Sequence, residues 1–179
     1  IAERLHSVVR QASAETGKRV NLVIENGRIE MDRLLLDRML GGFEHILRNC
    51  VDHGIESSTV RESRGKPATG TITLTVNHEG NDVSISFKDD GAGLDLEAIR
   101  RKGIERGLIA PGQVVPDKDL SNLIFMPGFT TAQELTGISG RGIGMDVVRV
   151  DVNALGGRVE TSSVHEKGTT FRLIMPLTT

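Results

Sequence analysis

The sequence contains no tryptophan and no tyrosine, and its only aromatic side chains are five phenylalanines. Recognition of a base or ring therefore cannot rest on aromatic stacking. One cysteine leaves no internal disulfide framework and fits a reducing compartment. No apolar run of about 18 residues and no signal-peptide pattern is present, so we expect a cytoplasmic protein without direct membrane insertion. The 22 Lys and Arg nearly balance the 24 Asp and Glu, and no basic patch predicts a nucleic-acid partner.

The apolar periodicity of the 179 residues predicts one α+β domain with its own core. Helices are expected over 1–16, 33–53, 95–106 and 144–155, and strands over 20–24, 28–31, 71–76, 83–87, 158–162 and 169–175. Helices that alternate with hairpins predict a two-layer sandwich with one mixed sheet. Residues 107–139 are irregular except for a short helical piece near 120–125, and a long segment of this kind is usually a functional lid or a mobile loop.

The helix expected over 33–53 has an unusual polar face. Its apolar side carries Leu36, Met39, Leu40, Phe43, Ile46, Leu47, Cys50 and Val51, so Cys50 is expected in the core. The opposite side carries His45, Arg48, Asn49, Asp52 and His53, with Gly41 and Gly42 one turn earlier. Periodicity alone favours an ordinary solvated face, but such faces usually carry Lys, Glu and Gln. The residue types instead favour a site that something approaches closely.

Three glycine clusters accompany this helix. They are Asp89-Asp90-Gly91-Ala92-Gly93 after a strand, Ser139-Gly140-Arg141-Gly142-Ile143-Gly144 before a helix, and Gly168-Thr169-Thr170 at the start of the last strand. The second cluster could cradle a phosphate, because its backbone N–H groups and the helix start favour an anion. It is neither a dinucleotide fingerprint nor a P-loop, since no strand leads into it and no Gly-Lys-Ser/Thr follows.

In order and spacing, these segments resemble the ATP-binding domain of the GHKL superfamily and, within it, the CheA-type histidine kinases. The matching boxes are His45…Asn49…Asp52-His53-Gly54 (N box), Asp89-x-Gly91-x-Gly93 (G1 box), Phe125–Thr131 (F box), Ser139–Val148 (G2 box) and Gly168-Thr169. The likeness runs from about Gly17 to Leu177. It extends weakly to the chemotaxis-like kinases of pilus-motility systems.

The resemblance implies a role for each matching residue. Asn49 would hold Mg²⁺, which takes its other ligands from phosphates and water. His45 and His53 would lie near the γ-phosphate, with Arg48 close by as a positive charge. Asp89 would accept the adenine N6 proton. The remaining ligand-binding positions are Asp52 in the N box, Gly91 and Gly93 beside the base, Thr169 by the adenine pocket, and Ser139, Gly140, Arg141, Gly142, Ile143, Gly144 and Met145 around the phosphates.

The implied activity is transfer of the ATP γ-phosphoryl to a histidine on a separate phosphotransfer domain. The ATPase branches of the superfamily place a water-activating Glu four residues before the Asn, where this chain has His45, and Glu44 is off register. Two alternatives stay open: a regulatory module that binds nucleotide without transfer, and a GHKL ATPase. Gly41-Gly42 replaces the Asp-Pro often found in CheA-type sequences, which puts the rigidity of that helical turn in doubt.

The resemblance also implies the architecture around the site. It predicts a mostly antiparallel mixed sheet with helices on one face, and a flexible ATP lid over about 107–143. Residues 1–16 would be a linker helix from an upstream dimerisation region, and 17–179 the kinase domain. A CheW-like coupling domain would follow, and the parent kinase would act on a response regulator. The parent would be a homodimer and this fragment a monomer.

Overall fold

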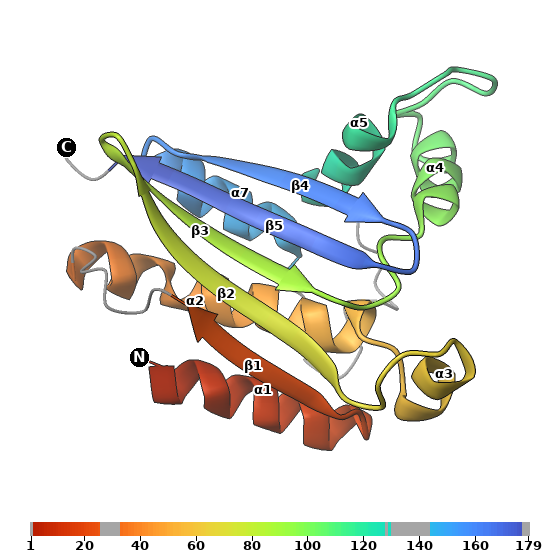
Figure 1. Ribbon diagram of the computed structural model, residues 1–179. Coiled ribbons are helices and arrows are strands. Elements are labelled where there is room, and N and C mark those ends of the chain that lie inside the picture. Colours follow the sequence, from red (N-terminus) through yellow and green to blue (C-terminus); the bar gives the residue numbers. More distant parts are fainter. Residues whose placement is uncertain (1, 26–32, 128, 130–143, 177–179) are drawn as a thin grey trace.

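The computed structural model describes residues 2–25, 33–127, 129 and 144–176 (Figure 1). Its helices are α1 (Ala2–Thr16), α2 (Arg33–Asn49), α3 (Ser58–Ser63), α4 (Leu96–Glu105), α5 (Asp117–Asn122) and α7 (Met145–Ala154), with a π-helical turn at Cys50–Gly54 and a 3₁₀ turn at Leu123–Phe125. Its strands are β1 (Val20–Glu25), β2 (Gly70–Glu79), β3 (Asp82–Asp89), β4 (Arg158–Val164) and β5 (Gly168–Pro176). In these parts of the chain, none of the helices is long and apolar enough to cross a membrane.

The five strands form one mixed sheet in the order β1-β2-β3-β5-β4. Only the β1–β2 pair among them is parallel, with Val20 opposite Gly70, and α2 supplies the crossover that a parallel pair needs. The predicted mixed, mostly antiparallel sheet is confirmed. The expected hairpin partner of β1, residues 28–31, lies outside the described residues, and the described partner of β1 is β2.

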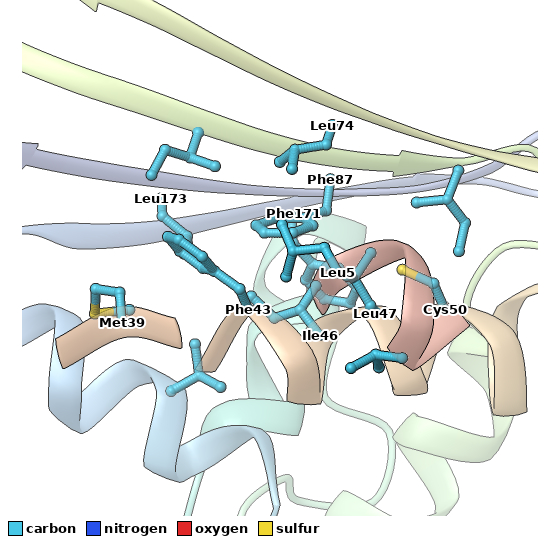
Figure 2. Close-up of a cluster of buried hydrophobic side chains, with 14 of the residues drawn as sticks. Leu5, Met39, Phe43, Ile46, Leu47, Cys50, Leu74, Phe87, Phe171 and Leu173 are labelled. Atoms are coloured by element: carbon cyan, nitrogen blue, oxygen red, sulfur yellow. The ribbon is translucent and has the colours of Figure 1, made fainter. Parts of the chain in front are cut away.

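Helices α1, α2 and α7 cover one face of the sheet, as predicted (Figure 1). Alternation along β3 turns Val83, Ile85 and Phe87 toward this face. Figure 2 shows side chains of α2 meeting those of the strands, and the Phe43 and Phe87 ring centroids lie 5.5 Å apart. The opposite face carries mostly small polar side chains, among them Thr71, Thr73, Thr75, Ser84, Ser86 and Thr170.

Helix α1 is part of this same core. Leu5, Val8, Val9 and Ala12 are buried in the cluster that α2 and the sheet form. A boundary drawn after residue 16 therefore cuts through a packed unit. The connection of α1 to an upstream dimerisation region stays a prediction.

The expected helix over 33–53 is confirmed as far as Asn49, but its last turn is wider than an α-helix. Ile55 donates its N–H to the carbonyl of Cys50 at 2.8 Å, a five-residue spacing. The Lys18 ammonium donates hydrogen bonds to the carbonyls of Val51 (2.7 Å) and Asp52 (2.9 Å). These bonds satisfy carbonyl oxygens that the end of a helix leaves without a partner. A distant lysine thus stabilises the π-turn, which helical periodicity does not reveal.

The two glycines of α2 have different surroundings. Gly41 is exposed, and a Cβ there would meet no described residue within 4 Å. A Cβ on the buried Gly42 would lie 3.4 Å from the Met39 Cε and 4.0 Å from the Val148 methyls of α7. The sequence predicts that something approaches this helix closely, and at Gly42 the element that does so is α7.

A second, smaller core cluster lies beside the sheet. Its buried members are Ile99, Ile109, Leu120 and Phe129, from α4, α5 and the segments around them. Helix α4 is found where it is expected, and Asp95 caps it by accepting the N–H of Ala98 at 3.0 Å. The short helix expected near 120–125 is also found, although it begins earlier, at Asp117.

Candidate nucleotide-binding site

Asp89 is a buried carboxylate at the end of β3, and only 1% of the residue is exposed. Its Oδ1 accepts the backbone N–H groups of Gly91 (2.9 Å) and Thr169 (3.2 Å). The buried Cys50 thiol, a weak donor, also faces this carboxylate. Burial raises the pKa of Asp89, and the hydrogen bonds from Gly91, Thr169 and Cys50 oppose that rise. The result is a fixed acceptor whose second oxygen has capacity to spare.

Three glycines allow the backbone to close around Asp89. A Cβ on Gly54 would lie 2.7 Å from Asp89 Oδ2, and one on Gly91 would lie 2.0 Å from the Gly54 carbonyl oxygen. Gly168 has a φ of +126°, and its Cβ would meet the Asp89 carbonyl oxygen at 1.9 Å. The end of the π-turn, the end of β3 and the start of β5 therefore meet here without side chains between them.

His45 and Asp52 carry the unsatisfied polar atoms of the α2 side of the site. His45 Nε2 and Asp52 Oδ1 are both buried, and neither has a hydrogen-bond partner among the described residues. Burial lowers the pKa of His45, an effect that Asp146 opposes and that His53 and Arg48 strengthen. Burial likewise raises the pKa of Asp52, against the pull of His53, Arg48 and Lys18. Buried polar atoms without partners are expensive, so this face suits a polar ligand.

Arg48 is engaged elsewhere in this structure. Its Nη1 lies 3.2 Å from Glu15 Oε2 of α1. The guanidinium is thus held by α1, whereas the role near the γ-phosphate stays a prediction. His53 is exposed and Asn49 is half-buried at the end of α2.

The other expected ligand-binding positions have surroundings of different kinds. Gly93 adopts a φ of +83°, and its Cβ would lie 2.7 Å from the Val164 carbonyl oxygen, so the backbone it admits is that of β4. Met145 packs its side chain into the main core, which leaves only its backbone to face a ligand. Gly144, the N-cap residue of α7, has no side chain with which to bind the first N–H groups of that helix, and such groups favour an anion. Ser139, Gly140, Arg141, Gly142 and Ile143 lie outside the described residues.

The residues also fit a magnesium–nucleotide complex. Among the described residues, no group of three or more His, Cys, Asp and Glu side chains could hold a metal ion by themselves. Mg²⁺ bound with a nucleotide needs few protein ligands, since phosphates and water supply the rest. The half-buried amide of Asn49 stands on the same helix face as the unsatisfied His45 Nε2, which suits such a partial ligand set.

Sequence reasoning missed the residues that bind the loop directly after Asp89. Glu56, Arg61 and Lys66 form an ion-pair cluster that reaches the loop following β3. The only sequence signal for them is an acidic residue a few positions before two basic ones. Such a pattern is common on surfaces, and only the fold shows that Arg61 is buried.

The comparisons with known proteins identify the family of this chain. The family model described as histidine kinase-, DNA gyrase B- and HSP90-like ATPase matches residues 38–179. The chain is 42% identical over 178 residues to the chemotaxis protein CheA of Treponema pallidum, covering 99% of this chain and 22% of that protein. It is 43% identical over 180 residues to CheA of Halobacterium salinarum, covering 99% of this chain and 27% of that protein. The chain thus spans about a quarter of the length of these relatives.

The fold is also found among solved structures. The histidine kinase domain of the Erythrobacter litoralis blue-light activated histidine kinase superimposes with a TM-score of 0.51 at 14% identity, covering 97% of this chain and 59% of that one. At this identity the likeness concerns the fold alone. The resemblance of the sequence to GHKL proteins and to CheA is therefore confirmed, and the chain belongs to the histidine kinase-, DNA gyrase B- and HSP90-like ATPase family, whose implied ligand is ATP.

Proposed function

We propose that this chain is the ATP-binding catalytic domain of a CheA-type histidine kinase that transfers the γ-phosphoryl of ATP to a histidine on a separate phosphotransfer domain. The observation that carries the proposal is the Asp89 carboxylate, which is buried and fixed through Oδ1 by the N–H groups of Gly91 and Thr169. A fixed buried acceptor suits the N6 amino group of adenine. It discriminates against a base with a carbonyl there, because two acceptors would face each other.

Each part of the site has its own task in this mechanism. Asp89 and Thr169 bind and orient the base, and the start of α7 with the residues before it binds the phosphates. Asn49 holds Mg²⁺, which in such sites neutralises phosphate charge during transfer. His45 is neutral near pH 7, because burial lowers its pKa below the usual 6.5. His45 lies near the end of α2 and His53 in the π-turn that follows, where the γ-phosphate would be directed.

Transfer to an external acceptor is favoured over hydrolysis by the surroundings of Glu44. The position of the water-activating Glu of the ATPase branches is taken by His45. Glu44 turns to α1 instead, where its Oε1 lies 2.7 Å from Arg4 Nε. A carboxylate paired there does not reach the face that carries Asn49.

The partners follow from the same proposal. CheA is the printed name of the relatives, and each of those chains is about four times as long as this one. We infer that the parent of this chain is a homodimer that includes a phosphotransfer domain and a CheW-like coupling domain, and that it signals to a response regulator. A pilus-motility system is one setting for such a kinase.

Calorimetric titration of a non-hydrolysable ATP analogue, with and without Mg²⁺, tests the binding site. Asp89→Asn is expected to abolish binding, whereas Asp82→Asn, at the start of the same strand, serves as the matched control and keeps it. A wild-type chain that binds no analogue would refute the proposal. Phosphorylation of an added phosphotransfer domain then separates a kinase from a binding module, and steady phosphate release without an acceptor would indicate an ATPase.

A further inference from the structure

Three basic side chains converge on Glu56, the second residue after the π-turn. Arg61 Nη1 lies 2.9 Å from Glu56 Oε1, and Lys66 Nζ lies 2.7 Å from Oε2. Arg64 Nη1 is more distant, 3.7 Å from Oε2. The Arg61 and Glu56 side chains are 1% and 6% exposed, so this is a buried ion pair rather than a surface one. A buried pair of this kind is strongly destabilised when one partner is removed.

Arg61 and Lys66 do more than neutralise Glu56, because both reach the loop that follows β3. Arg61 donates to the Asp90 carboxylate Oδ2 at 3.2 Å and to the Asp90 carbonyl at 3.1 Å. Lys66 donates to the same carbonyl at 3.3 Å and to the Gly91 carbonyl at 3.0 Å. Two cationic side chains therefore bind the carbonyl groups of this loop.

The peptide unit between Asp90 and Gly91 links these cations to Asp89. A trans peptide is planar, and its C=O and N–H point in opposite directions. The carbonyl of this unit, on Asp90, is bound by Arg61 and Lys66. The N–H of the same unit, on Gly91, donates to Asp89 Oδ1 at 2.9 Å. Fixing one end of the unit therefore fixes the direction of the other.

The remaining contacts hold the loop against translation. Asp90 Oδ1 accepts the N–H of Thr71 from β2 at 2.8 Å, and the Gly54 carbonyl accepts the N–H of Ala92 at 3.0 Å. Arg61 is itself anchored, since its Nε donates to the Pro67 carbonyl at 2.7 Å. The cluster is thus rigid on the side away from Asp89 as well.

We propose that Arg61 and Lys66 are positioning residues of the adenine site: they orient the Asp90–Gly91 peptide so that its N–H holds the Asp89 carboxylate in the geometry that selects adenine. The inference rests on the proposed function, because it assumes that Asp89 reads the base. A purely structural cluster would stabilise the fold without affecting which base is bound. Loss of a positioning residue should therefore change the preference for adenine over other bases, whereas loss of a purely structural residue should not.

Lys66→Met is the variant that tests the proposal. Arg61 is less suitable, because its removal would leave Glu56 buried with fewer partners and endanger folding. Lys66 is 18% exposed, and its loss leaves the Arg61–Glu56 pair intact. Arg64→Met is the matched control. Arg64 also pairs with Glu56, but unlike Lys66 it donates no hydrogen bond to Asp90 or Gly91. Lys66→Arg preserves the charge.

The measurement is the ratio of the affinities for ATP and inosine triphosphate, whose base presents a carbonyl at position 6. Lys66→Met is expected to lower this ratio at least ~5-fold, while Arg64→Met keeps it within ~2-fold and Lys66→Arg recovers most of it. Urea unfolding of each variant reports any general loss of stability. Equal weakening of both nucleotides by Lys66→Met would overturn the positioning role.

The wild-type result separates this inference from the proposed function. A wild-type chain that prefers ATP upholds the adenine site, and the variants then decide the role of Lys66 alone. A wild-type chain that binds both nucleotides equally, or neither, would refute the reading of Asp89 and the positioning role with it.

Discussion

His45 is the residue whose chemistry depends most on its surroundings. It stands where related ATPases carry a carboxylate, and its buried Nε2 has no partner in the part of the chain that the structure describes. Burial favours the neutral imidazole more strongly than the nearby Asp146 favours the cation, and His53 and Arg48 add to the preference. A neutral ring can accept a proton or a hydrogen bond near pH 7, which a buried imidazolium cannot.

The depressed pKa of His45 predicts a specific dependence of stability on pH. Its folded-state pKa lies below 6.5, so the unfolded chain binds a proton first as the pH falls. The stability tied to neutral His45 is therefore complete above about pH 6.5 and is lost as the pH falls through the folded-state pKa. Urea unfolding of wild type and His45→Gln over this range should show a steeper loss in wild type. His78→Gln, an exposed histidine on β2, is the control, and parallel curves for wild type and His45→Gln would contradict the prediction.

Single residues were predictable from the sequence where a motif names them. Asp89 follows a strand and precedes Gly91, and within the order of the boxes this pattern is specific enough to identify the buried acceptor from sequence alone. Arg61 and Lys66 were not predictable, because their importance comes from contacts with Asp90 across 24 or more positions of the chain. Their partners become neighbours only when β2 and β3 pair.

At the scale of elements, the π-turn Cys50–Gly54 connects α2 to the backbone that surrounds Asp89. Its hydrogen bond spans five residues instead of the four of an α-helix, and Gly54 at its end lies against Gly91, whose Cβ would lie 2.0 Å from the Gly54 carbonyl oxygen. Periodicity predicted a helix here and identified its buried face. It did not predict the wider turn, because the ammonium that binds the turn comes from Lys18, before β1.

Removal of the Lys18 ammonium should loosen this turn. Lys18→Met leaves the Val51 and Asp52 carbonyls without their donor, and a buried acceptor left unsatisfied costs about 1–3 kcal/mol. We expect a lower free energy of unfolding of that order in urea, together with weaker binding of the ATP analogue. Arg19→Met removes a positive charge from the neighbouring exposed position and is the matched control. Equal stabilities of the two variants would show that the carbonyls find other donors.

At the scale of the whole molecule, the fold class was predictable and the pairing of β1 was not. The apolar periodicity of the helices and the alternation of the strands are local signals, and they predicted the helices and hairpins of a two-layer sandwich. The parallel pairing of β1 with β2 depends on contacts between residues about 50 positions apart, such as Val20 with Gly70. No local pattern encodes a partner at that distance.

The molecule also divides its apolar side chains into two clusters of unequal size. The larger one joins α1, α2, α7 and the sheet, and the smaller one joins α4, α5 and Phe129 near one end of the sheet (Figure 1). Among the described residues, partly buried Ile124 is the side chain that packs against both. This small overlap of the two clusters predicts that the smaller one can open while the sheet stays folded.

Native-state hydrogen exchange should therefore detect two levels of protection. Amides of α4 should exchange through a local opening, at a lower free energy than amides of β3 such as that of Ile85, which require global unfolding. Leu120→Ala, in the smaller cluster, should lower the α4 and the β3 values alike, by about 2–5 kcal/mol or down to the detection limit, because both openings disrupt that cluster. Leu47→Ala, in the larger cluster, should lower the β3 value and leave the α4 value nearly unchanged, because the local opening keeps the larger cluster intact. An α4 value that falls as much as the β3 value in Leu47→Ala would mean that the two clusters unfold as one cooperative unit.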